Sequence, residues 1–350
     1  MTSADRIRDE LSALLPHASF VRHRSIAVLL PCYNEEAAIA AVIRGFRKAL
    51  PGATIYVYDN NSTDKTSEIA RAEMAVVRLE AFQGKGNVVR RMLADIDADI
   101  YVMADGDLTY DATAAGRMVD LLVSKNLDMV VGTRIADEDE AFRKGHRFGN
   151  RLFNEIVARL FGPNFSDILS GYRVISRRFA KSFPAASSGF EIETEFSVHA
   201  IDLRLATAEV PLHYGKRPQD SVSKLKTYSD GFRILRMIVN MFRKLKPFQF
   251  FGLIAASLFM ASAFFGLPVI IEFIETGLVP RLPTAILAAS FAQMGFISLA
   301  CGVIIDAVSA QGRELRRMRY LDLAAPGENR IQQTEPATAS AVFAPVAMSA

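Results

Sequence analysis

The chain has 350 residues, half of them hydrophobic, and a formal net charge of +3. This length supports one large or two medium domains, and the small net charge argues against a nucleic-acid binder. Two cysteines, Cys32 and Cys301, argue against a disulfide framework and fit a reducing compartment. Residues 1–25 contain acidic residues and no long apolar core, so we expect an amphipathic segment and not a signal peptide.

Residues 26–135 alternate between short apolar runs and segments with helical periodicity. We predict strands at 26–31, 53–59, 75–80, 100–105 and 127–134, and helices at 34–50, 62–72 and 86–96. This order predicts an α/β fold with a largely parallel sheet. Ligands of such sheets bind beyond the carboxyl ends of the strands. Three polar clusters follow predicted strands: "CYNEE", "DNNSTD" and "DGD".

Two apolar spans, 248–271 and 285–305, contain no charged residue. A helix needs about 20 apolar residues to cross a membrane, so both spans qualify, with a buried hairpin of soluble helices as the alternative. Basic residues dominate both outer flanks, so both ends are expected in the cytoplasm. We therefore expect an N-terminal segment (1–25), a catalytic domain (26–227), an interfacial amphipathic helix (228–247), a transmembrane hairpin (248–308) and a basic segment with a disordered tail (309–350).

The stretch "MADGDLTY" places Asp105 and Asp107 just after a predicted strand. Two carboxylates at this spacing repel each other unless a cation lies between or beside them. Mg²⁺ is commonly held by one or two carboxylates, with substrate phosphates and water completing its shell. A solvated acidic turn is the alternative, and the position at the rim of a parallel sheet favours the metal site.

The other strand ends carry groups suited to a nucleotide. Tyr33 can pack on a base, and the carboxylates of Glu35 and Asp59 can accept hydrogen bonds from a base or ribose. The alternative is that these segments only cap helices, and the position of both acids at the same rim favours a ligand. The "QGKGNVV" stretch places Lys85 between two glycines before a helix, an arrangement suited to phosphate.

These motifs carry a family resemblance. "PCYNEE", "DNNSTDKT", "GKGNVVR" and "DGD", in this order and spacing, resemble glycosyltransferase family 2, which has the GT-A fold. "VGTR", "RFGNRLFNEIVARLFG", "FSDILSGYRV", "VPLHY" and "SVSKL" resemble the polyprenyl-phosphate glycosyltransferases within it, such as dolichyl-phosphate mannose synthase and the bactoprenol-phosphate enzymes. The resemblance covers about residues 26 to 308.

The resemblance implies an inverting enzyme that moves a sugar from a nucleotide sugar to a polyprenyl phosphate. It assigns nucleotide binding to Pro31, Tyr33, Glu35, Asp59, Lys85, Gly86 and Asp105, and Mg²⁺ or Mn²⁺ to Asp105 and Asp107. It assigns catalysis to Asp105, Asp107 and Arg134, and the acceptor phosphate to Arg147, Asn150, Arg217, Ser223 and Lys224. For the basic residues the alternative is a face that meets solvent or lipid headgroups.

The resemblance also implies a bacterial inner-membrane protein with a cytoplasmic catalytic domain, and a homo-oligomer that can be a tetramer. Two residues depart from the family pattern: Asn60 stands where the family often has a second Asp, and Thr109 stands where mannose synthases often have Gln. Because of Thr109 and the two apolar spans at the C-terminal end, which are typical of the bacterial members, we favour a UDP-sugar over GDP-mannose. The chain contains no Trp and so lacks the Q-x-x-R-W signature of processive synthases, which favours a single transfer.

Two other functions compete with this interpretation. "DGDLT" also matches the D-x-D-x-[TV] of haloacid-dehalogenase-type phosphatases, in which Asp105 would be the nucleophile and Asp107 the general acid, with Mg²⁺. Two strand–helix units precede the motif here, whereas that family carries it near the start of its domain. A non-catalytic membrane scaffold would leave the convergence of three polar strand ends unexplained.

Overall fold

A computed structural model describes residues 24–135, 165–189, 191–215, 239–240, 242–243 and 246–326. The segment expected at 1–25, most of the interfacial helix expected at 228–247 and the end of the tail lie outside the described residues. The description therefore covers most of the expected catalytic domain and both apolar spans.

The domain is built on one seven-stranded sheet with the order β3-β2-β1-β4-β6-β5-β7. The strands are β1 (Ile26–Cys32), β2 (Thr54–Asp59), β3 (Val76–Leu79), β4 (Ile100–Met103), β5 (Met129–Ile135), β6 (Arg173–Ser176) and β7 (Thr207–His213). Only β6 runs antiparallel, between β4 and β5. The predicted largely parallel sheet is confirmed, and the antiparallel β6 is an addition that the sequence did not predict.

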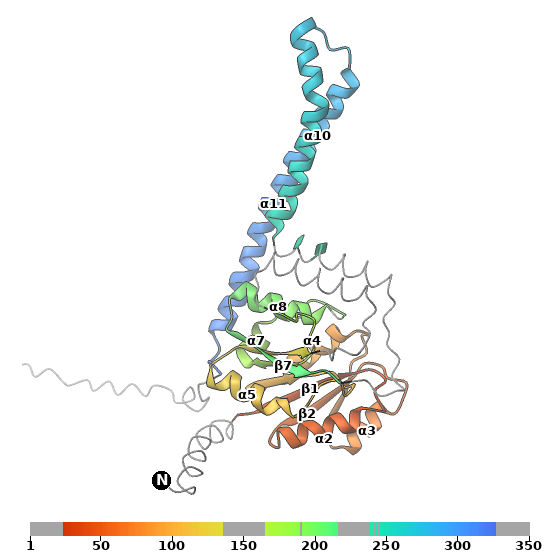
Figure 1. The fold of residues 1–350 in the computed structure, drawn as a ribbon, viewed down its shortest axis with the longest axis vertical. Helices are drawn as coiled ribbons and strands as arrows, with labels where there is room; N and C mark the ends of the chain where they lie inside the picture. Colours follow the sequence, from red (N-terminus) through yellow and green to blue (C-terminus); the bar gives the residue numbers. More distant parts are fainter. Residues whose placement is uncertain are drawn as a thin grey trace, which may run out of the picture.

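Helices cover both faces of this sheet (Figure 1). One layer contains α2 (Ile39–Ala49), α3 (Thr66–Ala72) and α5 (Ala114–Ser124), and the other contains α4 (Lys85–Asp95), α7 (Arg177–Ser182) and α8 (Ile192–Leu203). Because both faces are covered, the central strands read as continuous apolar runs and not as alternating ones. β4 is buried at all of its positions.

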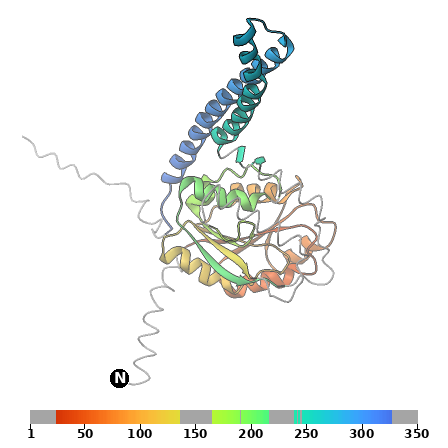
Figure 2. The same ribbon diagram turned by 45° about the horizontal axis from the view of Figure 1, so that its top comes forward.

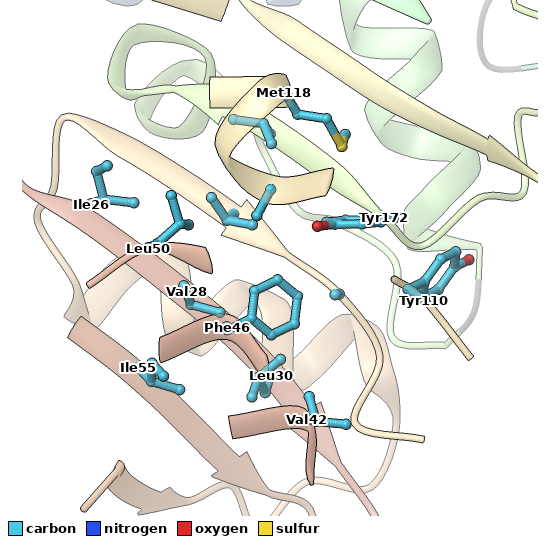
Figure 3. Close-up of a cluster of buried hydrophobic side chains, with 14 of the residues drawn as sticks. Ile26, Val28, Leu30, Val42, Phe46, Leu50, Ile55, Tyr110, Met118 and Tyr172 are labelled. Carbon is cyan, nitrogen blue, oxygen red and sulfur yellow. The ribbon is translucent and has the colours of Figure 1, made fainter. Parts of the chain in front are cut away.

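The core reaches the end of the sheet where the polar clusters lie. Figure 3 shows Tyr172 and Tyr110 at one side of the buried cluster and Phe46 near its middle. The Tyr172 ring lies 6.0 Å from that of Phe46 and 5.4 Å from that of Tyr110. The Tyr110 hydroxyl accepts a hydrogen bond from the Gly171 N–H (2.9 Å), so the core fixes the backbone just before β6.

Two long helices, α10 (Pro247–Thr276) and α11 (Leu282–Leu321), form a hairpin that projects from the domain (Figures 1 and 2). Both are long and apolar enough to be candidate membrane spans. Their outer faces expose large apolar side chains, such as Phe264 (73%) and Ile274 (76%). Ser262 and Ser298 donate hydrogen bonds across the hairpin to the carbonyls of Ala288 and Phe251. Such polar contacts are a usual means of packing helices in lipid.

α11 extends past residue 308, the predicted end of the hairpin, to Leu321. Its 40 residues correspond to about 60 Å, roughly twice the hydrocarbon thickness of a bilayer. The last turns dock on the domain: Arg316 pairs with Asp202 (2.9 Å) and the Tyr320 hydroxyl donates to Asp128 (2.9 Å). The basic end of α11 is thus part of the joint between hairpin and domain.

Candidate active site

The DGD loop begins directly after β4 and holds its two carboxylates in different environments. Asp107 is 2% exposed, and its Oδ1 accepts hydrogen bonds from the Thr109 hydroxyl (2.6 Å) and the Thr109 N–H (3.2 Å). The Asp105 side chain is 28% exposed and contacts the Lys85 ammonium. The loop therefore holds the Asp107 carboxylate in place by hydrogen bonds and leaves the Asp105 carboxylate accessible.

Lys85 offsets the charge of the accessible carboxylate. Its Nζ contacts Asp105 and also lies 2.6 Å from Oε1 of Glu193, which belongs to the first turn of α8. Burial by itself lowers the pKa of Lys85, but the two carboxylates raise it by more, so the side chain stays charged. Burial, together with the nearby Asp105, raises the pKa of Glu193.

Gly84 and Gly86 allow the start of α4 to lie against the chain at 187–188. A Cβ on Gly84 would lie 2.1 Å from the Ser188 carbonyl oxygen, and one on Gly86 would lie 2.2 Å from that of Ser187. The Gly86 N–H donates to the Ser188 carbonyl (3.1 Å). The phosphate-binding N–H groups expected here from the sequence are therefore partly used within the protein, and Lys85 is the charged group that this turn presents.

The chain after β2 is organised by Asp59 and Asn60. Asp59 is 4% exposed and accepts hydrogen bonds from the Ser62 N–H (2.8 Å) and the Ser67 hydroxyl (2.6 Å). It does not cap α3, whose N-cap residue is Lys65, so its carboxylate instead holds the loop that follows β2. Asn60 donates to the carbonyls of Glu80 and Phe82 and accepts from the Gly84 N–H. An Asp carboxylate at this position could not donate these two bonds.

Pro31, near the end of β1, and Tyr33 and Glu35, in the loop after it, are half-buried at the same end of the sheet. The Glu35 N–H donates to the Thr66 hydroxyl (2.8 Å), and the Asn34 N–H donates to the Ser62 hydroxyl (2.9 Å). The two loops that follow β1 and β2 are therefore cross-linked by short polar side chains. The predicted nucleotide residues share one rim, and their contacts with a nucleotide stay a prediction.

Arg134, at the end of β5, forms a forked pair with Asp167, with distances of 2.7 Å from Nε to Oδ2 and 2.8 Å from Nη2 to Oδ1. Its guanidinium also lies 5.6 Å from the centre of the Tyr214 ring. The Arg134 side chain is 28% exposed, so one part of it remains accessible at the rim. Asp167 orients the arginine that the sequence assigns to catalysis.

A buried arginine shapes the chain that passes Asp105. Arg173 is fully buried and donates to the carbonyls of Ser170 (2.9 Å) and Ile168 (2.7 Å) and to the Ser197 hydroxyl (3.0 Å). Burial lowers the pKa of Arg173 to about 10, so it stays charged at neutral pH. These bonds fix residues 168–171, and Gly171 packs directly on the Asp105–Lys85 pair.

The residues assigned to the acceptor phosphate, Arg147, Asn150, Arg217, Ser223 and Lys224, lie outside the described residues. The described chain shows where their segments leave the sheet. Arg134 and Asp167 stand on either side of residues 136–164 and pair with each other. The Gly215 N–H, just before residues 216–238, donates to the Thr109 carbonyl (2.8 Å). The described residues next to both segments, Arg134 and Gly215, therefore lie at the rim that carries the DGD loop.

The donor set at this rim fits a hard divalent cation. No group of three or more His, Cys, Asp or Glu side chains that could hold a metal occurs among the described residues. Mg²⁺ and Mn²⁺ do not need one, because substrate phosphates and water supply the remaining ligands. Asp105, accessible beside the locked Asp107, offers the carboxylate oxygen that this chemistry requires.

Two site residues escape the sequence analysis. Glu193 comes from α8, far along the chain, and Asp167 precedes β6, a strand that the sequence did not predict. A signal for Asp167 was present in "FSDILSGYR", where it is the single acid in a turn-rich stretch. Glu193 carried no comparable signal, since it is one of three glutamates in "FEIETEF".

Comparison with known proteins now identifies the family. Residues 27–183 match the model of glycosyl transferase family 2. The chain is 33% identical to glycosyltransferase AglJ of Haloferax volcanii over 85% of this chain and 98% of the relative. It is 29% identical to a dolichyl-phosphate hexose transferase of the same organism over 61% of this chain and 92% of the relative.

A solved structure shows the same fold. Glucosyl-3-phosphoglycerate synthase from Mycobacterium tuberculosis, in complex with Mn²⁺, UDP and phosphoglyceric acid, superposes with a TM-score of 0.52 at 26% identity. The match covers 65% of this chain and 80% of that one. The GT-A-like fold is thus confirmed, and the phosphatase alternative is left without support. The chain is a member of glycosyltransferase family 2.

Proposed function

We propose that this protein transfers one sugar from a nucleotide sugar, with a UDP-sugar favoured, to a polyprenyl phosphate at the cytoplasmic face of a bacterial inner membrane. The observation that carries the proposal is the docking of α11, an apolar hairpin helix, on the domain that holds the DGD loop. A sugar-transfer site attached to two candidate membrane helices suits an acceptor whose tail stays in the bilayer. The dolichyl-phosphate hexose transferase among the relatives supports the same acceptor class.

The reaction we propose is a single displacement with inversion. An oxygen of the acceptor phosphate attacks the anomeric carbon, and the bond from that carbon to the nucleoside diphosphate breaks. A phosphate monoester is already anionic near pH 7, so this chemistry does not require a strong general base. Catalysis then depends on charge stabilisation at the leaving and entering groups.

The described residues divide that task. Asp105 and Asp107 would hold a divalent cation, which when bound stabilises the negative charge of the leaving diphosphate. Lys85 carries its positive charge beside Asp105 and would face the same diphosphate. Asp167 holds Arg134 through Nε and Nη2, and the part of the guanidinium that stays accessible would meet a phosphate oxygen.

The direct test uses the full chain, purified in nanodiscs, with undecaprenyl phosphate, Mg²⁺ and a labelled nucleotide sugar. UDP-glucose, UDP-galacturonate, UDP-aminoarabinose and GDP-mannose are tried separately. We expect label to enter the organic phase with one of these donors, and not in an Asp105→Asn variant. Hydrolysis of p-nitrophenyl phosphate without any sugar transfer would replace the proposal with the phosphatase.

A second test addresses the acceptor loop. Lys224→Ala is expected to raise the KM for undecaprenyl phosphate about tenfold or more while UDP binding stays unchanged, because a charge-assisted contact contributes about 1.5–3 kcal/mol. An equal loss of UDP affinity, or no effect on either substrate, would remove Lys224 from the acceptor site.

A further inference from the structure

Glu193 has no role in the reaction proposed above, yet it lies against the residues that perform it. It is 4% exposed in the first turn of α8, and its Oε1 lies 2.6 Å from the Lys85 ammonium. Its Oε2 is buried and has no hydrogen-bond partner in the described part of the chain. Burying a carboxylate oxygen without a hydrogen-bond partner destabilises the folded state, so the presence of Glu193 at this position calls for a physical explanation.

Lys85 is shared between two carboxylates. Its ammonium contacts both Asp105 and Glu193, and the Lys85 side chain is only 10% exposed. Gly171 closes the trio from another side: a Cβ there would lie 2.9 Å from Oδ2 of Asp105 and 3.1 Å from Lys85 Nζ. The ammonium therefore has little room to move except between its two acids.

A divalent cation and the Lys85 ammonium are both positive, so they compete for Asp105. If Lys85 had only Asp105, a cation arriving there would leave a buried ammonium unpaired, which is unfavourable. A second carboxylate removes that difficulty, because Lys85 can keep one ion pair while the other is given up.

We propose that Glu193 is a positioning residue that retains Lys85 beside the diphosphate site when a divalent cation takes over Asp105. The proposal rests on the cation and nucleotide site of the proposed function and adds a residue to it. Glu193 acts through Lys85 and touches neither the cation nor the sugar.

The test is a double-mutant cycle read by Mn²⁺ binding, with electron paramagnetic resonance of the full chain in detergent and UDP present. Glu193→Gln preserves the shape of the side chain and removes its charge. Lys85 is then held more tightly by Asp105, and we expect the Mn²⁺ affinity to fall about tenfold. In a Lys85→Met background the remaining buried Glu193 becomes neutral, so adding Glu193→Gln is expected to change the Mn²⁺ affinity less than about twofold.

Mn²⁺ binding without UDP provides an independent arm. Lys85→Met removes the competing ammonium, so Mn²⁺ alone is expected to bind about tenfold more tightly than to the unaltered chain, whereas UDP affinity in the presence of Mn²⁺ falls. Glu191→Gln is the matched control, because it changes the same group at the N-cap of α8, where no ion pair with Lys85 occurs among the described residues. Thermal melting checks that each variant is folded, and Lys85→Gln repeats the cycle if Lys85→Met is unstable.

An equal loss of Mn²⁺ affinity from Glu193→Gln in both backgrounds would make Glu193 a cation ligand and overturn the proposal. No effect of Glu193→Gln on the unaltered chain would overturn it as well. These measurements use neither polyprenyl phosphate nor sugar transfer. The role of Glu193 can therefore be confirmed even if the acceptor is not a polyprenyl phosphate, and it can be refuted even if the acceptor is one.

Discussion

Asp128 and Asp105 both contact basic side chains, but they differ in how many hydrogen-bond donors surround the carboxylate. Asp128, 1% exposed at the joint with α11, accepts four hydrogen bonds: from the Ser176 hydroxyl, two nitrogens of Arg178 and the Tyr320 hydroxyl. Asp105 shares one ammonium with Glu193, whose second oxygen has no hydrogen-bond partner in the described chain.

This difference indicates that the charge of Asp128 is structural and that the charge of Asp105 is functional. At the joint, every lone pair is directed to a donor, so the cluster holds two parts of the chain together and has no capacity for a ligand. At the DGD loop, negative charge exceeds positive charge, and part of the Asp105 side chain stays accessible. An excess of carboxylate at an accessible strand end is the condition that a divalent cation and its diphosphate can relieve.

The first prediction removes the charge of the functional carboxylate. Asp105→Asn is expected to lower sugar transfer by about 10³-fold, because it removes a group that stabilises transition-state charge, while the melting temperature stays nearly constant. Turnover with labelled UDP-sugar and thermal melting check this. Asp111→Asn, at a nearby exposed acid, is the control. Near-normal turnover of Asp105→Asn would show that the excess charge has no catalytic role.

The second prediction removes the structural carboxylate. Asp128→Ala leaves the Arg178 guanidinium without its paired acid and Tyr320 without its acceptor. We expect a loss of about 3 kcal/mol or more in the free energy of unfolding of the domain, measured by urea denaturation. Asp111→Ala, which removes only local bonds to Thr113, is expected to cost no more than about 1 kcal/mol. Similar losses in both variants would contradict a structural role for the joint.

The third prediction concerns pH at the same joint. His199 is buried, contacts the Ser182 hydroxyl at 3.0 Å and packs on Phe179 and Phe183. Burial, with a smaller contribution from Arg316, lowers the pKa of His199 to about 3. Below pH 6.5, His199 binds a proton in the unfolded chain but not in the folded one. Its contribution to the free energy of unfolding is therefore fully present above pH 6.5 and is lost as the pH falls toward 3.

At pH 5 this difference amounts to about 2 kcal/mol relative to pH 8. His199→Phe is expected to remove that part of the acid sensitivity, since Ser182 still donates to the Phe179 carbonyl. Urea denaturation of both proteins at pH 8 and pH 5 measures it. If the two proteins lose the same stability between these pH values, the acid sensitivity comes from other groups.

The smallest effect is expected from Tyr320→Phe. The ring stays over Arg178, whose guanidinium carbon lies 4.7 Å from its centre, and only the hydrogen bond to Asp128 is lost. A loss of about 1 kcal/mol in the free energy of unfolding follows from the usual contribution of one such bond. Arg316→Ala, at the pair with Asp202, gives a second measure of the joint. No change in either variant would mean that α11 docks by its apolar contacts alone.

The sequence by itself determined the local features of this protein. The apolar runs identified β1 to β5, because burial on both faces of the sheet gives continuous apolar stretches, and helical periodicity identified α2 to α4, because burial on one face gives a period. The order of these elements implied the parallel sheet, and hence that Glu35, Asp59 and Asp105 would share one rim. The two apolar spans were equally visible, since their length and lack of charge do not depend on the rest of the fold.

Only the tertiary structure decided which charges meet. β6 is short and antiparallel, and it lies between two strands that precede it in the chain, so no local pattern revealed that it carries Gly171 to Asp105. Glu193 reaches Lys85, Asp167 reaches Arg134, and Tyr320 reaches Asp128 across long stretches of sequence. Such pairings depend on how helices pack over a sheet, which the periodicity of a single segment does not contain. The composition of single segments therefore predicted the kind of site. The packing of helices on the sheet decided which of its carboxylates have hydrogen-bond donors from the protein and which remain available to a ligand.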